Sequence, residues 1–191
     1  MTTTAPKIYV ASLSDYNNGI LHGRWIDCDK DADWMRAEIA DMLRGSHYPN
    51  VTVEHPETGE MVPSAEEYAI HDSEGLPFTG EHIDLDRIAE YMETIDDLND
   101  SEIEAFHAWI ENDSDREIDV DSFRDQYRGC WDTLEDYVQN YWEECSEFKG
   151  DSQWWHPTNY IDWDRMGNDL RLSGDVWTHD GSEGIHVFDN R

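Results

Sequence analysis

The stretch "DLNDSEIEAFHAWIENDSDREIDVD" (residues 97–121) carries ten carboxylates and a single arginine. Ile103, Phe106 and Ile110 recur in it at intervals of three and four residues, which predicts the apolar face of a helix. A disordered acidic tail would lack such a face, and an ordinary surface helix would mix Lys or Arg with its acids. The stretch therefore predicts a folded helix whose polar faces are almost entirely negative.

The rest of the chain is acidic as well. Its 191 residues include 13 basic and 45 acidic side chains, for a formal net charge of −32. Nine Trp, nine Tyr and five Phe can fill a core, so we expect a folded protein with its acids outside, because unpaired buried carboxylates are costly. Such a surface repels nucleic acid and anionic membrane, so neither is an expected partner, whereas basic protein surfaces are.

The three cysteines, Cys28, Cys130 and Cys145, are odd in number and far apart, which argues against a disulfide framework and fits a reducing compartment. The sequence shows no apolar run of signal-peptide or membrane-spanning length. We therefore expect a cytoplasmic protein.

Periodicity and turn residues predict a mixed α+β fold. In the first part we expect a strand, a turn and a strand over 7–27, a helix over 33–44 ended by Gly45, and short strands at 51–55 and 66–72. Helices are expected over 84–97 and 101–112, the second with a capping box of Ser101 and Glu104. Farther on we expect a short helix ended by Gly129, an amphipathic helix over 133–148 with Cys145 on its apolar face, a helix over 160–172 and a hairpin over 174–189.

Signals for catalysis or metal binding are weak. Asp27, Asp29, Asp31 and Glu38 have the spacing of four EF-hand ligands, but Ala32 stands where the calcium loop needs glycine. We interpret these acids as capping for the helix that starts near residue 33. Histidine–glutamate zinc motifs, glycine-rich phosphate loops and nucleophile elbows are absent from the sequence. We expect no catalytic residue, no metal and no cofactor.

The charge pattern leaves two interpretations open. One is adaptation to high salt, which also favours acids and leaves few lysines, of which there are three. The other is imitation of a polyanion. Duplex DNA carries one charge per about 1.7 Å, so a charge of −32 corresponds to roughly 54 Å of duplex.

Several segments resemble those of ArdA-type antirestriction proteins, in the same order. They are "PKIYVASLSDYNNGILHGRWID" (6–27), "EEYAIHDSEGLPF" (66–78), "DSFRDQYRGCWDTLEDYVQNYWEE" (121–144), "NYIDWDRMGNDLRLSGDVWT" (159–178) and "IHVFDN" (185–190). The resemblance implies an elongated chain of three small domains: a β-rich N-terminal α+β domain (1–72), a helical middle domain (73–118) and an α+β C-terminal domain (119–191). It also implies a homodimer formed through the last domain. The partner would be a type I restriction–modification enzyme, whose DNA-binding groove the protein would occupy as a DNA mimic, blocking restriction and often modification of mobile DNA.

The resemblance also implies which residues act. The segment 121–144 matches the family's antirestriction motif. The acids expected to stand in for phosphates, called here the predicted acidic set, are Asp86, Glu90, Glu93, Asp97, Asp100, Glu102, Glu104, Glu111, Asp113, Asp115, Glu117, Asp119, Asp121, Asp125, Asp132, Glu135, Asp136, Glu143, Glu144 and Glu147. For the dimer contact we expect Tyr137, Tyr141, Trp154 and Trp155. The alternative function is that of a salt-adapted acidic protein with another basic partner.

Overall fold

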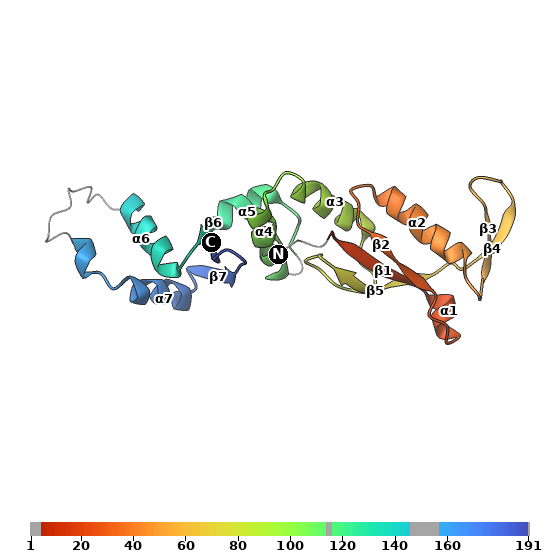
Figure 1. Cartoon of the computed structure of the whole chain (residues 1–191), viewed down its shortest axis with the longest axis horizontal. Coiled ribbons are helices and arrows are strands. Elements are labelled where there is room, and N and C mark those ends of the chain that lie inside the picture. The colour runs from red at the N-terminus through yellow and green to blue at the C-terminus, as the bar shows by residue number, and fades with distance from the viewer. Residues whose placement is uncertain (1–4, 114–115, 146–156, 191) are drawn as a thin grey trace. The chain divides into compact units, whose positions relative to one another are not determined.

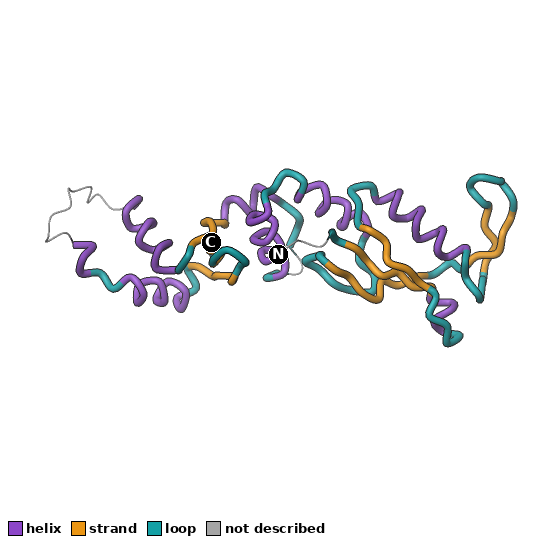
Figure 2. Tube along the Cα trace, viewed as in Figure 1, coloured by secondary structure: helices purple, strands orange, loops and turns teal. Residues whose placement is uncertain are grey.

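A computed structural model describes residues 5–113, 116–145 and 157–190. Helices and small antiparallel sheets alternate along the chain, which confirms the predicted α+β class (Figures 1 and 2). Contacts between residues group the chain into two compact units. The first unit holds residues 1–98 and 110–118, and the second holds 99–109 and 119–191.

The first unit is built on a three-stranded antiparallel sheet in the order β2-β1-β5. Its strands are β1 (Lys7–Ser12), β2 (Gly23–Asp27) and β5 (Tyr68–Glu74). Helix α2 (Ala32–Arg44) begins after its N-cap Asp31 and ends at Gly45, as predicted. Its buried side chains, Met35, Ile39, Met42 and Leu43, are the four that the helical period predicts to share one face.

The predicted turn between β1 and β2 contains a short helix instead, α1 (Leu13–Asn17). Asp15 in this helix is fully buried, which sequence reasoning missed. Its carboxylate accepts hydrogen bonds from Ser46 Oγ at 2.6 Å and from the backbone N–H groups of His47 and Tyr48 at 2.8 and 3.2 Å. Burial alone would raise the pKa of Asp15, but these hydrogen bonds outweigh it and hold the pKa below its ordinary value.

Two further parts complete the first unit. Strands β3 (Val51–Glu54) and β4 (Met61–Ser64) form a separate two-stranded sheet. Helix α3 (Leu85–Ile95) buries Leu85, Ile88 and Tyr91 and is connected to the returning segment 110–118, because Arg87 donates to the backbone carbonyl of Arg116 at 3.0 Å.

The second unit has a three-stranded antiparallel sheet in the order β6-β8-β7. Its elements are α4 (Asp100–Glu111, of which the last two residues belong to the first unit), α5 (Val120–Gln126), β6 (Tyr127–Trp131), α6 (Leu134–Cys145), a 3-10 turn (Pro157–Tyr160), α7 (Trp163–Ser173), β7 (Val176–Asp180) and β8 (Ile185–Asp189). The β7–β8 hairpin and the α4, α6 and α7 helices confirm the sequence-based expectations.

Two groups of packed side chains lie in the described part of the second unit. Phe106 and Trp109 of α4 pack on Phe123 of α5, with ring centroids 5.2 and 5.9 Å from that of Phe123. Farther along the chain, Val138 of α6 packs beside Gly167 of α7, where an added Cβ would lie 3.0 Å from Leu134. The close packing of α6 on α7 therefore depends on that glycine.

Three local predictions were wrong. Residues 127–129 begin strand β6 instead of ending a helix. The backbone φ of Gly129 is 101°, a value that residues other than glycine rarely adopt. Cys145 is exposed, because it lies at the last residue of α6, beyond the core cluster around Tyr137 and Val138. The capping box of α4 is formed by Asn99 and Glu102, whose side chains each accept the other's backbone N–H at 3.0 Å.

The predicted division into three domains is not confirmed. Contacts place residues 73–98 of the predicted middle domain in the first unit and 99–109 in the second. Phe106 and Trp109 of α4 have an aromatic partner in Phe123 of α5, which accounts for the grouping of residues 99–109 with the second unit.

Candidate functional site

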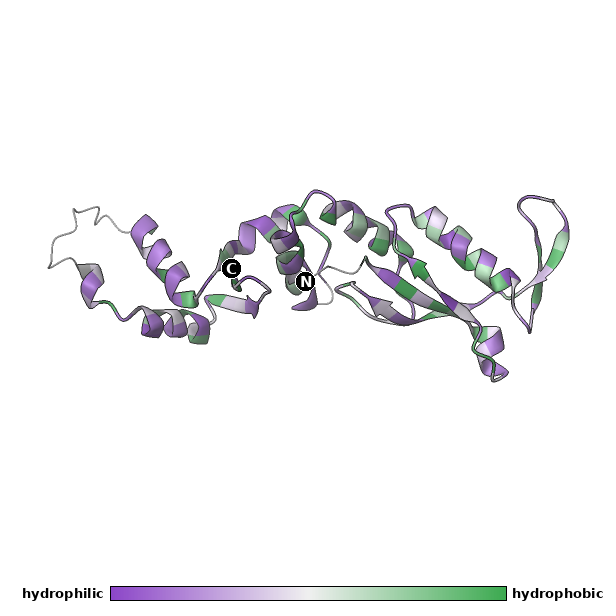
Figure 3. Ribbon diagram, in the orientation of Figure 1, coloured by the Kyte–Doolittle hydropathy of each residue, from purple (hydrophilic) through white to green (hydrophobic). Residues whose placement is uncertain are grey.

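The candidate functional residues are exposed carboxylates, carried on α3 in the first unit and on α4, α5 and α6 in the second. Hydrophobic and hydrophilic residues alternate along α3 and α4 in Figure 3, as expected of helices with one buried face. Of the described members of the predicted acidic set, all are exposed except Glu102 and Glu104, which are partly buried. Asp115 and Glu147 lie outside the described residues.

Some of these carboxylates have a local structural role. Asp119 caps α5, accepting from the backbone N–H of Asp121 at 3.0 Å and from Ser122 Oγ at 2.6 Å, and these bonds lower the pKa of its carboxyl. Asp136 accepts from Thr133 Oγ1 at 2.6 Å near the start of α6. Asp86, in the first turn of α3, pairs with Arg36 at 2.6 Å. Such acids stabilise the helix starts that they flank.

Glu104 has a different role from its neighbours. Both of its carboxylate oxygens accept the backbone N–H of Ser182 in the β7–β8 turn, and Oε2 lies 3.5 Å from Nε2 of His186. His186 is fully buried, and its Nδ1 lies 2.9 Å from the hydroxyl of Tyr127. Burial alone would raise the pKa of Glu104, but the bonds from Ser182 and His186 hold it below its ordinary value. Glu104 thus joins α4 to the sheet of the second unit.

Other acids stand where they oppose helix formation. Glu93 lies in the last turn of α3, Glu111 ends α4, and Glu143 lies in the last turn of α6, and none of these turns contains a base. A negative charge at the C-terminal end of a helix is unfavourable to the helix dipole. These carboxylates therefore do not owe their positions to the stability of their own helices.

Among the described residues of the second unit, two arginines pair with carboxylates. Arg128 pairs with Asp189 at 2.6 Å, and Arg165 approaches Asp169 at 4.0 Å. Neither of these acids belongs to the predicted acidic set. Within the part of the chain that the structure describes, the carboxylates along α5 and α6 therefore make no ion pair with these arginines.

Of the residues expected at the dimer contact, Tyr137 is buried in the core of its own unit, and Tyr141 is 46% exposed. Trp154 and Trp155 lie outside the described residues. The homodimer and its contact residues remain predictions.

The acids with EF-hand spacing are engaged otherwise. Asp31 caps α2, accepting the backbone N–H groups of Asp33 and Trp34 at 3.0 and 3.1 Å, and Glu38 pairs with Arg24 at 3.0 Å. Within the described residues, no three His, Cys, Asp or Glu side chains are grouped so as to hold a metal ion.

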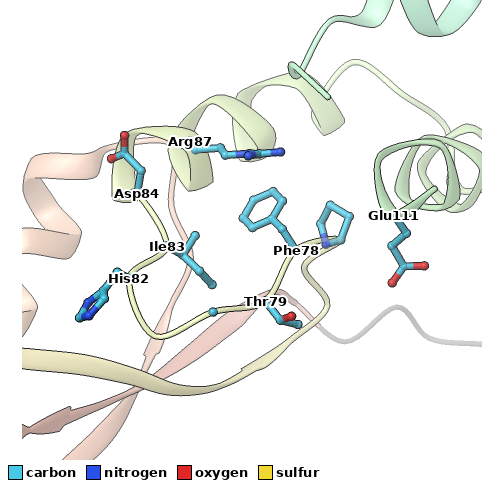
Figure 4. A pocket seen from close by; sticks show the side chains of 9 residues that line it. Phe78, Thr79, His82, Ile83, Asp84, Arg87 and Glu111 are labelled. Carbon is cyan, nitrogen blue, oxygen red and sulfur yellow. The ribbon is translucent and has the colours of Figure 1, made fainter. Parts of the chain in front are cut away.

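A cavity of about 660 Å³ lies beside the start of α3. The guanidinium of Arg87 lies over Phe78, 4.9 Å from the ring centroid. Figure 4 shows these two side chains together, with Glu111 farther along the lining. Asp84 is used as the N-cap of α3, accepting the backbone N–H of Asp86 at 3.0 Å. Arg87 and Asp84 of this lining thus help to hold the first unit together.

Comparison with known protein families identifies one family that the chain matches. Residues 8–183 match the family model described as antirestriction protein (ArdA). A search of curated proteins finds no match. Within the described parts of the chain, none of the helices combines the length and apolar character that crossing a bilayer requires.

Proposed function

The chain belongs to the ArdA family of antirestriction proteins, and from this premise we propose that it acts as a DNA mimic that occupies the DNA-binding groove of type I restriction–modification enzymes. Membership itself implies an antirestriction function. The proposal adds the mechanism, the enzyme class and the inhibition of both restriction and modification. It also places the protein in the cytoplasm, as a homodimer whose partner is the methyltransferase core with its specificity subunit.

One observation carries the proposal: exposed carboxylates lie on α3, α4 and α6 at positions where they oppose the helix dipole, as at Glu93, Glu111 and Glu143. Acids retained against helix stability are expected to serve binding. A groove that binds duplex DNA is lined with Lys and Arg and therefore attracts such a surface.

The mechanism is competition without chemistry. The carboxylates are carried on helices with packed cores, so they lose little conformational freedom when a partner binds. Long-range attraction between an acidic inhibitor and a basic groove should speed association, and salt should slow it. Blocking the groove excludes DNA from both the cleaving and the methylating forms of the enzyme, so no bond in the inhibitor need be made or broken.

The test is displacement of labelled DNA from a type I methyltransferase, measured at several salt concentrations. An unrelated protein of similar net charge serves as the control. We expect this chain to displace DNA at near-stoichiometric amounts and the control to fail. If both act equally weakly, the charge is generic, and adaptation to salt becomes the better explanation, with folding that itself requires high salt.

A further inference from the structure

The first unit contains a groove between α2 and the β3–β4 hairpin, away from the predicted acidic set. Its volume is about 600 Å³. Ala37, Ala40 and Leu43 of α2 line one side, and Val51 and Val53 of β3 line the other, so the walls are mostly apolar. Figure 3 shows hydrophobic residues on the strands of the hairpin.

On the helix side, the groove is open because the side chains are small. Helix α2 packs on the sheet of the first unit through Met35, Ile39 and Met42. Ala37 and Ala40 are exposed and face the groove. A larger side chain at either position would fill part of the space.

On the hairpin side, β3 and β4 pair only with each other among the described strands. An isolated two-stranded hairpin is at best marginally stable in water, so its apolar face benefits from further covering. Val51 and Val53 are only partly buried, while Thr52 between them is exposed on the opposite face of the strand. Two valines thus remain available to a partner.

The rim of the groove is negative. Glu54 and Glu66 are exposed at its edge, and within the described residues neither makes an ion pair. The base on the rim, Arg44, pairs with Asp41 at 2.9 Å. An occupant must therefore bring apolar side chains for the walls and positive charges for the rim.

We propose that this groove docks an apolar segment that is flanked by Lys or Arg and is presented by a basic protein. The apolar side chains would pack against Ala40 and Val53, and the flanking cations would pair with Glu54 and Glu66. DNA mimicry needs no such groove, because phosphates offer nothing that would pack on apolar walls. The inference therefore goes beyond the proposed function and does not depend on it.

The test uses the full chain and two labelled peptides, one of alternating valine and lysine and one of alternating serine and lysine, with binding followed by fluorescence anisotropy. The peptides carry the same charge, so only the apolar contact differs. We expect the valine peptide to bind about tenfold more tightly.

The decisive variant is Ala40→Glu. It makes the chain more acidic, so general attraction of both peptides should increase, while the glutamate blocks the apolar wall. Glutamate suits an exposed helix position and has Arg44 four residues later, so α2 should keep its structure. We expect the preference for the valine peptide to disappear in this variant and to persist in Thr52→Glu, which adds the same charge to the opposite face of β3.

Equal binding of the two peptides to the wild-type chain would overturn the inference, as would a preference that survives Ala40→Glu. A wild-type dimer that Ala40→Glu converts to monomers in sedimentation would overturn it too, since the groove would then hold a second copy. Because none of these measurements involves a restriction enzyme, failure of the DNA-displacement test would leave their results unaffected.

Discussion

Glu104 accepts the backbone N–H of Ser182 with both carboxylate oxygens, at 2.9 and 3.0 Å, although 78 residues separate the two in the sequence. The contact holds α4 against the β7–β8 turn. It distinguishes Glu104 from the exposed acids of the predicted set, because a carboxylate that fixes the fold has less freedom to face a partner.

Replacing Glu104 with Gln should destabilise the second unit by about 1–2 kcal/mol, because hydrogen bonds from the Ser182 backbone to a charged acceptor are weakened or lost. Denaturation by urea, followed by tryptophan fluorescence, measures the change. Asp125→Asn is the matched control, since Asp125 is exposed on α5, and it should change stability by less than about 0.5 kcal/mol. Equal effects of the two substitutions would contradict a structural role for Glu104.

The second unit should lose stability as the pH falls below 6.5. Burial lowers the pKa of His186 beneath its ordinary 6.5, and the neighbouring Glu104 offsets this only in part. Below 6.5 the unfolded chain therefore binds a proton at this position more readily than the folded chain does, so protonation favours unfolding. In His186→Gln, the slope of unfolding free energy against pH should be smaller from 6.5 downward. An unchanged slope would show that His186 is not the responsible group.

Glu90→Lys should make α3 more stable and the protein no better as an inhibitor. Glu90 lies four residues after Asp86 and three before Glu93, so the substitution replaces two repulsions with two attractions, and it replaces one attraction, to Arg87 three residues earlier, with a repulsion. We expect a net gain of about 0.2–0.5 kcal/mol, seen as a higher urea midpoint with an unchanged slope. Glu90→Gln should give about half of that gain. A loss of stability in Glu90→Lys would mean that the acid has an unrecognised structural partner.

Reversing Glu135, Glu143 and Glu144 to Lys together should weaken DNA displacement by at least about tenfold and flatten its salt dependence, because fewer charges then face the basic groove. The control reverses Asp27, Glu57 and Glu81, which are also exposed and lie outside the predicted acidic set, and it changes the net charge by the same amount. Circular dichroism checks that both variants fold. If the two triple variants lose the same potency, total charge matters and its placement does not.

How much of this could be predicted depends on the range of the interactions involved. Helices α2 and α3 could be predicted from the helical spacing of their apolar residues and from their capping residues. Met35 and Ile39 in α2, and Leu85 and Ile88 in α3, are close in sequence and lie on the buried faces. The acidity of the surface follows from composition. Helix α1 could not be predicted in the same way, since five residues are too few for a periodic signal and its anchor, Asp15, is held by donors from residues 46–48.

The candidate site shows the same limit. Sequence reasoning placed Glu104 among the surface acids because its position on α4 resembles theirs. Its distinguishing partner, Ser182, lies in a turn that only the folded chain brings near. The groove beside α2 was missed for a related reason. Alanine occurs on both buried and exposed helix faces, so Ala37 and Ala40 give no signal of a groove, and the valines of β3 come close to them only in the folded structure.

The route of the chain through α4 has a consequence for synthesis on the ribosome. The chain leaves the first unit after residue 98, contributes 99–109 to the second, and returns for 110–118 before its final departure. The first unit therefore lacks its last segment until residue 118 has emerged from the exit tunnel, while Phe106 and Trp109 emerge before their partner Phe123. During that interval Phe106 and Trp109 lack their contact with Phe123, and a translational pause there would extend the period in which chaperones or proteases can engage this part of the chain.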